Sequence, residues 1–402
     1  MEILCVSNGH GEDQVAVRVA LELEKLGAKV KALPMVGVGS AYEKANIEIL
    51  AEGVQAMPSG GFVRMDSKQL VGDLRGGLLQ LTRKQIGLVR DWSVKKTSQK
   101  RLVLAVGDIV PLLLAWLPTW VGGCDFSFIA TAKSEYYWRD RLGKLLEVKP
   151  TWGGSVFYPW ERWLISQKSC KNVYVRDRLT AEWLNQKFRL GVQYLGNPMM
   201  DRLDQQDLGL DIKADDWIVS ILPGSRAPEV YQNWDTLLQG AEILARHLPH
   251  PVHFLAAIAP DLDPEKLKQI LQQTGWTEIS ENRFRHNSSY LYLVSQGFGA
   301  CLHLCHLGLA MAGTATEQLV GLGKPAITIA GTGPQFTRGF ALDQAKLLGL
   351  SVKLIDKPSQ IGGVIEQMLQ DPDYFQLVVE NGYERMGLPG ASKAIANSLF
   401  MH

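Results

Sequence analysis

The segment from Leu307 to Ala330, LGLAMAGTATEQLVGLGKPAITIA, constrains the fold most, because an apolar run, a small-residue loop, an amphipathic stretch and a second apolar run follow one another. This order predicts strand, loop, helix, tight turn and strand. The first N–H groups of a helix lack partners, and the positive end of the helix dipole favours an anion. The segment therefore predicts a diphosphate site, although any α/β unit needs a small residue at such a turn.

A second strand end of the same kind occurs earlier in the chain. The apolar run Trp217–Leu222 leads into Pro223-Gly224-Ser225-Arg226, and a helical pattern follows from Glu229 to His247. A guanidinium group binds phosphate oxygens through a planar fork, which a lysine cannot do. Two such strand ends in one half of the chain favour a shared ligand site over a purely structural explanation.

These motifs resemble the lipid-A-disaccharide synthase family of UDP-sugar-dependent glycosyltransferases. The resemblance rests on LPGSR followed by Glu229, on GTAT with a nearby glutamate, and on GNPMMD at 196–201, and it is densest between Tyr174 and Ala330. Where the family reads GTATLE this chain has GTATEQ, so it resembles a divergent relative. The resemblance implies an α/β fold of two Rossmann-like doubly wound domains facing a cleft (GT-B-like), with a C-terminal helix crossing back to the first domain.

The same resemblance implies that the second domain binds a UDP-sugar. Arg226 and the N–H groups of 313–316 would contact the diphosphate, and Glu317 would accept hydrogen bonds from the ribose hydroxyls. Gln335 would touch the donor sugar. The predicted donor site is therefore Gly224, Ser225, Arg226, Gly313, Thr314, Ala315, Thr316, Glu317 and Gln335.

The composition argues against several classes of protein. The chain of 402 residues is 46% hydrophobic and 21% charged with a formal net charge of +1, which gives no reason to expect nucleic-acid binding. Its five cysteines include no CxxC pair, which favours a reducing compartment over a disulfide framework. Cys301, His303, Cys305 and His306 lie close enough in sequence for a metal site, but buried cysteines explain them better. We expect neither a metal nor a cofactor.

The first domain opens with the apolar strand Met1–Ser7, a glycine loop up to Asp13, and a helical pattern over Val15–Leu26. No basic leader precedes the strand, which predicts a cytoplasmic protein. Glu12 and Asp13 would repel a pyrophosphate, so this loop suits a sugar or an acceptor hydroxyl. In the family resemblance, Asp13 corresponds to the aspartate that ends the glycine loop.

A candidate base follows the apolar strand Arg101–Val106, where Gly107-Asp108 lies at the carboxyl tip. In such folds the crevice outside the strand tips binds ligands. The resemblance favours Asp108 as the base that deprotonates the acceptor, whereas His10 has the more suitable free pKa. Both remain candidates, and a single attack on the anomeric carbon would invert it.

Three segments are candidates for the acceptor or a membrane surface. Ile109–Cys124 is too short to span a bilayer and is either a core helix or a surface patch. In Gly60–Trp92, basic residues alternate with apolar ones, as on a solvated helix face or on a surface that binds anionic lipid headgroups. Aromatic and basic residues also mix over Tyr136–Trp163, which suits lipid, glycan or a packed loop. The predicted acceptor or membrane residues are Trp116, Trp120, Tyr136, Tyr137 and Trp138.

The polar stretch Asp201–Asp216 reads as an interdomain linker. We expect an acceptor domain at 1–205, a nucleotide-sugar domain at 206–372, and helices at 373–402 that pack back on the first domain. The expected function is an inverting, metal-independent transfer from a UDP-sugar to a lipid-linked acceptor at the inner face of a membrane. A UDP-sugar epimerase that uses His10, Glu12 and Asp13 is one alternative, and a non-catalytic membrane-associated scaffold is another.

Overall fold

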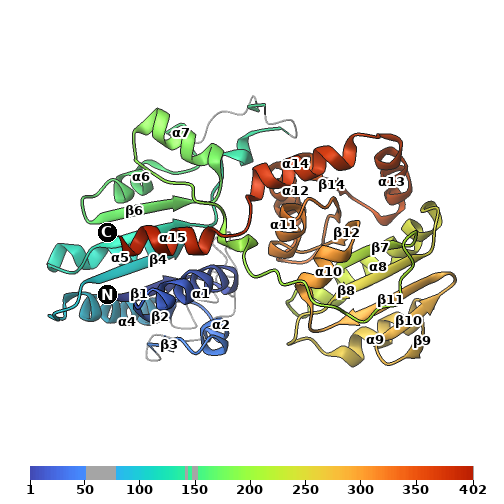
Figure 1. Cartoon of the computed structure of the whole chain (residues 1–402), viewed down its shortest axis with the longest axis horizontal. Coiled ribbons are helices and arrows are strands. Elements are labelled where there is room, and N and C mark those ends of the chain that lie inside the picture. The colour runs from blue at the N-terminus through green and yellow to red at the C-terminus, as the bar shows by residue number, and fades with distance from the viewer. Residues whose placement is uncertain (51–77, 141–143, 147–152, 402) are drawn as a thin grey trace. The chain divides into compact units, whose positions relative to one another are not determined.

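The computed structural model describes residues 1–50, 78–140, 144–146 and 153–401, and the chain forms two compact units (Figure 1). Unit 1 comprises Met1–Glu135, Val148–Asp201 and Leu388–His402, and unit 2 comprises Tyr136–Glu147 and Arg202–Gly387, in so far as these ranges are described. The part of the basic segment before residue 78 lies outside the described residues.

Unit 1 contains a six-stranded parallel sheet whose central strands are buried on both faces, as near-continuous apolar runs predict. Its order is β3 (Glu48–Ile49), β2 (Lys29–Pro34), β1 (Glu2–Ser7), β4 (Arg101–Gly107), β5 (Phe126–Ala130) and β6 (Cys170–Val175). The direction of winding reverses between β1 and β4. In a doubly wound sheet the ligand crevice lies at the carboxyl ends of the strands at this switch point.

Helices cover both faces of this sheet (Figure 1). One face carries α1 (His10–Lys25), α2 (Ser40–Lys44) and α15 (Ala391–Phe400), with α1 and α15 packed against each other. The other carries α4 (Leu78–Val94), α5 (Ile109–Trp116), α6 (Pro159–Ile165) and α7 (Arg178–Phe188). Short 3-10 turns are η2 (Leu117–Val121) and η4 (Pro198–Met200).

Unit 2 contains an eight-stranded sheet that is parallel except at one edge. Its order is β14 (Val352–Ile355), β13 (Ala326–Ile329), β12 (Leu307–Ala310), β7 (Trp217–Leu222), β8 (Val252–Ala257), β11 (Ser289–Val294), β10 (Arg283–His286) and β9 (Thr277–Ser280). Here the winding reverses between β7 and β12. Both predicted phosphate motifs directly follow these two strands.

The helices of unit 2 again cover both faces. On one face the core includes α8 (Glu229–His247), α9 (Pro264–Gln273) and α13 (Ile361–Gln370), while Cys301 of α10 (Phe298–Leu304) packs on the opposite face with Leu255 and Tyr292. The remaining elements are α11 (Thr314–Gly321), α12 (Arg338–Leu348), α14 (Tyr374–Met386), η3 (Glu135–Trp138), η5 (Gly349–Ser351) and η6 (Pro358–Gln360). The predicted α/β fold with two Rossmann-like sheets is confirmed.

The tail differs from its prediction. We expected all of 373–402 to pack on the first domain, but α14 belongs to unit 2 and packs against α11, and only the stretch from Leu388 belongs to unit 1. Gly382 allows the close approach of α14 to α11, because a Cβ at this position would lie 2.1 Å from the carbonyl oxygen of Val320. The tail therefore contributes one helix to each unit.

The expected linker is not a free tether. The carbonyl of Leu203 accepts a hydrogen bond from Nε2 of His303 (2.9 Å), and Leu208 and Leu210 pack against the cluster around Leu255. Since β7 begins at Trp217, the stretch before it is bound to the surface of unit 2. Across the described residues, every helix is too short or too polar to cross a bilayer.

Candidate functional site

The strand ends at the switch point of unit 2 are tied together by one buried side chain. Nδ2 of Asn233, in α8, donates to the carbonyl of Pro223 at 3.0 Å and to that of Met311 at 3.5 Å. Gly224, between them, has φ +100°, a conformation that favours glycine. Ser225 is exposed and Arg226 half-buried in the loop that follows. The β7 and β12 tips therefore lie side by side.

The residues after β12 form a helix start rather than a loop. Thr314, Ala315 and Thr316 make the first turn of α11 and Gly313 is its N-cap, so the helix begins three residues before the predicted Glu317. Oγ1 of Thr316 donates back to the carbonyl of Ala312 (2.6 Å), and Nε2 of Gln344 donates to the carbonyl of Gly313 (2.9 Å).

The start of α11 is suited to an anion. Its N-cap residue makes no side-chain cap hydrogen bond, whereas α7, α9 and α12 are capped by Asp177, Asp263 and Thr337. Because β7 and β12 are neighbouring parallel strands, the start of α11 and the Ser225–Arg226 loop follow adjacent strand ends at the same edge of the sheet, and the first N–H groups and the dipole of the helix favour an anion there. Glu317 follows in this first turn and is half-buried.

The loop of residues 331–337, which follows β13, is held to the Ser225–Arg226 loop. Glu229, the first residue of α8, is 5% exposed, and its two carboxylate oxygens accept from the backbone N–H of Gln335 (2.9 Å) and of Phe336 (2.7 Å). Gln335 therefore lies on a loop that is fixed relative to the Arg226 loop. From the sequence alone, Glu229 was recognised only as a residue of the family motif, and no sequence pattern pointed to Asn233 or Gln344.

Unit 1 has a polar pair at its own switch point. Asp108 caps α5 by accepting from the N–H of Val110 (2.9 Å), and the same oxygen, Oδ1, accepts from Nδ2 of Asn8 at 2.8 Å. Gly107 makes this approach possible, because a Cβ there would lie 2.1 Å from Oδ1 of Asn8. The adjacent strands β1 and β4 thus present Asn8 and Asp108 together.

Burial controls the ionisation of Asp108. The side chain is 7% exposed, and burial raises its pKa above the ordinary aspartate value. The hydrogen bonds from Val110 and Asn8 and the charge of Lys133 oppose this rise. Lys133 follows β5 and is held by an ion pair to Glu161 (2.5 Å) and by the ring of Tyr158. A raised pKa brings the carboxylate closer to the range useful for a base.

Asp13 and His10 lie on the first turns of α1 but in different surroundings. Oδ1 of Asp13 accepts from Oγ of Ser7 (2.5 Å), and Ser7 also contacts the hydroxyl of Tyr42 (2.6 Å). Asp13 is 3% exposed, and burial raises its pKa to about 7, with the charge of Glu12 adding to the rise and the Ser7 bond opposing it. His10 is exposed. The histidine is thus the more accessible of the two.

The predicted acceptor residues belong to two different units. Trp116 is buried, and two exposed tryptophan rings meet it edge-on, that of Trp120 at 4.7 Å and that of Trp163 of α6 at 5.2 Å between ring centroids. Tyr136 belongs to unit 2, where it is 4% exposed and donates to Glu384 (2.7 Å). Its ring also lies under the guanidinium of Arg385, so it is not an open stacking surface.

Tyr137 and Trp138 are half-buried next to it. The exposed tryptophans of α6, Trp160 and Trp163, were not singled out by the sequence, although both lie in the aromatic stretch. We name the exposed apolar residues of η2 and α6 the tryptophan patch; they are Trp120, Val121, Trp160 and Trp163.

The Cys/His segment shows no sign of a metal centre. Cys301 and Cys305 are buried, and the imidazole of His306 accepts from the N–H of Ile218 at 3.0 Å. His303 bonds to Gln205 and Leu203. Within the described part of the chain, no group of three or more His, Cys, Asp and Glu side chains could hold a metal ion.

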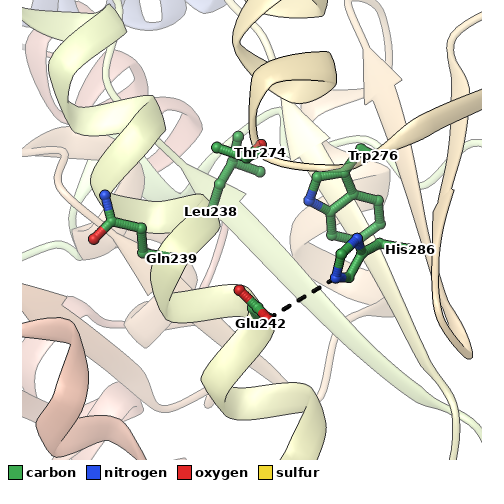
Figure 2. A pocket seen from close by; sticks show the side chains of 6 residues that line it. All are labelled: Leu238, Gln239, Glu242, Thr274, Trp276 and His286. Atoms are coloured by element: carbon green, nitrogen blue, oxygen red, sulfur yellow. Dashed lines mark ion pairs between the residues drawn. The ribbon is translucent and has the colours of Figure 1, made fainter.

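A small pocket in unit 2 lies away from these strand ends (Figure 2). It measures about 140 Å³ and is lined by Leu238, Gln239, Glu242, Thr274, Trp276 and His286. Glu242 and His286 face each other across it at 4.0 Å. Glu242 lies roughly 20 Å along α8 from Glu229 at 1.5 Å per residue. This pocket is too small for a nucleotide-sugar, since ligand sites measure roughly 300–1,000 Å³.

Comparison with known structures defines the class of fold. The calicheamicin glycosyltransferase CalG4 matches the whole chain with a TM-score of 0.62 and 14% identity, over 97% of its own chain. The UDP-GlcNAc 2-epimerase from Neisseria meningitidis, bound to UDP-GlcNAc, matches over the full length of both chains with a TM-score of 0.55 and 16% identity. The chain thus has the GT-B fold, which these transferases and epimerases share.

Sequence comparison names a family within this fold class. Residues 182–329 match the family model described as lipid-A-disaccharide synthetase. The lipid-A-disaccharide synthase of Persephonella marina is 28% identical over 201 residues, which are 47% of this chain and 48% of that protein. The chain spans about half the length of the curated relatives it matches. The chain is therefore a divergent relative of the lipid-A-disaccharide synthases.

Proposed function

We propose that the protein is a glycosyltransferase that moves a hexose or an N-acetylhexosamine from a UDP-sugar to a lipid-linked or glycolipid acceptor. The observation that carries this proposal is the uncapped start of α11 beside the Ser225–Arg226 loop, at the switch point of unit 2. Both motifs fall within the residues that match the family model. The Neisseria meningitidis epimerase, a fold neighbour bound to UDP-GlcNAc, supports a UDP-sugar as the donor.

In this proposal unit 2 stabilises the leaving diphosphate. Arg226 and the N–H groups of the first turn of α11 meet the phosphate oxygens, and Glu317 accepts from the ribose hydroxyls. These contacts strengthen as negative charge develops on the leaving group, so they lower the barrier and do not merely bind the donor. The cation and the helix dipole supply the counter-charge, and the mechanism assigns no role to a metal.

Unit 1 supplies the base in the same proposal. Asp108 takes the proton of the acceptor hydroxyl as that oxygen attacks the anomeric carbon, the bond to the diphosphate breaks, and the configuration inverts. Asp108 is favoured over His10 because Asn8 and the N–H of Val110 orient its carboxylate. Asp13 is bound to Ser7 and buried, which suits it to holding α1 against β1.

The acceptor is proposed to reach the protein from a membrane surface on its cytoplasmic side. The tryptophan patch exposes large apolar side chains, with Trp120 71% and Val121 62% exposed. Helix α4 packs on η2 and carries exposed basic residues, including Arg83, Lys84 and Arg90. Tryptophan next to basic side chains is the combination that binds the interface of an anionic bilayer.

The donor half is tested by thermal unfolding with a panel of nucleotides and nucleotide-sugars. At a hundredfold excess over Kd a ligand stabilises a protein by about 2.7 kcal/mol. We expect UDP or a UDP-sugar to raise the Tm of the wild type, and Arg226→Ala and Glu317→Ala to lose most of that rise. A panel in which no nucleotide raises the Tm contradicts the proposal.

An epimerase acting on the UDP-sugar alone is a second candidate, favoured by the fold neighbour of that activity and by the acids of α1. Incubation with UDP-GlcNAc without any lipid separates the two reactions. An epimerised sugar nucleotide identifies the second candidate, whereas conversion only after a glycolipid acceptor is added supports the transferase.

A further inference from the structure

Glu229 occupies an unusual position between two loops. Its carboxylate is 5% exposed, and both oxygens are used by backbone N–H groups that lie 106 and 107 residues further along the chain. The helix dipole stabilises a carboxylate in the first turn of a helix, but this stabilisation does not require the carboxylate to be buried. The burial indicates that the contact to the second loop is the reason for its placement.

The 331–337 loop is shaped around this carboxylate. A Cβ on Gly333 would lie 2.3 Å from Cδ of Glu229, so a side chain at this position would displace the carboxylate. A bridge between Gly331 and Thr337 closes the loop, and Phe336 is 4% exposed against Phe340. One side of the loop is therefore packed in the core, and the other is fixed by Glu229.

The two loops flank the start of α11. β12, which leads into α11, lies between β7 and β13, and the loops in question follow β7 and β13. One carries Arg226, three residues before Glu229, and the other carries Gln335, whose own N–H is one of the two held groups. A ligand at the start of α11 would thus meet two loops whose separation is set by a single carboxylate.

We infer that Glu229 is a positioning residue for a nucleoside diphosphate: it holds the Arg226 loop and the Gln335 loop at the separation that the ligand requires. This inference rests on the proposed function. Without the carboxylate the N–H groups of Gln335 and Phe336 lose their acceptor, and a buried polar group without a partner is costly enough to rearrange a loop. Glu229 itself touches no phosphate in this scheme, because a carboxylate and a phosphate are both anionic hydrogen-bond acceptors.

The test measures UDP binding by calorimetry for wild type, Glu229→Gln and Gly333→Ala. Glutamine keeps one acceptor oxygen and replaces the other with a donor, while Gly333→Ala displaces the carboxylate and changes no charge. We expect both variants to bind UDP roughly tenfold more weakly, about 1.4 kcal/mol. Hydrogen exchange should quicken at the amides of Gln335 and Phe336 in both.

Asp201 offers a matched control. It is also buried, and its two oxygens accept from the N–H groups of Gly390 (2.5 Å) and Ser392 (2.6 Å), but it lies in unit 1. Asp201→Asn should lower stability and leave the Kd for UDP unchanged. Faster exchange in 331–337 with an unchanged Kd in Glu229→Gln and Gly333→Ala overturns the inference while the donor site stands. A wild type that does not bind UDP refutes the proposed function, and the inference with it.

Discussion

Asp13 is a buried acid whose ionisation affects the stability of the fold. Burial raises its pKa to about 7 in the folded protein, from an ordinary value of 3.8. An acid whose pKa is raised by folding stabilises the fold fully below its unfolded pKa, and this contribution is lost as the pH rises through the folded value. The folded protein should therefore lose stability between about pH 4 and pH 7 because of this carboxyl group.

The corresponding prediction concerns Asp13→Asn. Asparagine cannot ionise and still offers Ser7 an acceptor, so at pH 8 the variant should be more stable than wild type by up to a few kcal/mol, about 1.4 for each pKa unit. At pH 5 the difference should be smaller, and it should vanish only below about pH 4, where the carboxyl group is protonated in both the folded and the unfolded protein. Urea unfolding at the two pH values measures both. Asp356→Asn, which breaks an exposed pair with Arg338, should change the curves little.

The prediction about catalysis concerns Asp108, the proposed base. Asp108→Asn should lower kcat by roughly 10²–10⁴-fold, because a general base contributes about that much, and leave the Kd for UDP unchanged. Asparagine can still cap α5, so the fold should survive. The acid limb of the wild-type pH profile should lie above that of a free aspartate, since burial raises the pKa. Full activity in Asp108→Asn together with a loss in His10→Gln would assign the base to the histidine.

At the residue scale, the sequence predicted which residues follow the strands, but not which side chains are buried or what they contact. Asp108 follows a strand that the apolar run Arg101–Val106 made visible, and the structure places it at the carboxyl end of β4. The surroundings of Tyr136 could not be predicted, because its partner Glu384 lies 248 residues away and no local pattern connects them. The contact of Tyr42 with Ser7, the hydrogen-bond partner of Asp13, was hidden as well, because Tyr42 and Ser7 lie 35 residues apart.

At the scale of elements, the packing of α14 on α11 makes a sharp prediction. Gly382→Ala would place a methyl group 2.1 Å from the carbonyl of Val320, and overpacking of this kind costs typically 1–3 kcal/mol. Gly363→Ala in α13 is the matched control, since nothing lies within 4 Å of its Cβ. There the change should stabilise by about 0.5–1 kcal/mol through helix propensity. Urea midpoints distinguish the two, and equal effects would contradict the packing argument.

Element boundaries followed from apolar periodicity where the run was long. α8 begins and ends at the predicted residues, Glu229 and His247. The start of α11 was placed three residues late, because threonine and glycine are poor helix formers and a propensity argument assigns them to a loop. In the structure a back-bond from Thr316 to Ala312 and the amide of Gln344 hold this turn.

At the scale of the whole molecule, the membrane proposal is tested with vesicles that contain phosphatidylglycerol. Trp120→Ser combined with Val121→Ser removes two of the most exposed apolar side chains, and co-sedimentation should fall roughly tenfold, since burying one large apolar side chain is worth about 1.5–3 kcal/mol. Ile279→Ser, 48% exposed in unit 2, should leave co-sedimentation unchanged. Equal losses from both changes would refute a specific patch.

Domain order was predictable because strands and helices alternate through both halves, a pattern that dictates parallel sheets. The assignment of the tail could not be predicted, since both α14 and α15 have helical patterns and no local pattern shows which unit each helix packs against. Composition also described 201–216 as a polar linker, but it could not reveal that Leu208 and Leu210 attach this stretch to unit 2.

The contribution of α15 to unit 1 has a consequence for biosynthesis. Ile395, Ala396 and Leu399 complete the core that contains α1, and Ser398 bonds to Tyr174 at 2.9 Å. The ribosome synthesises these residues after all of unit 2. The core of unit 1 therefore stays incomplete while unit 2 is synthesised and folds. A chaperone that covers the apolar side chains of α1 during translation would therefore remain in contact with this part of the chain until α15 has been synthesised.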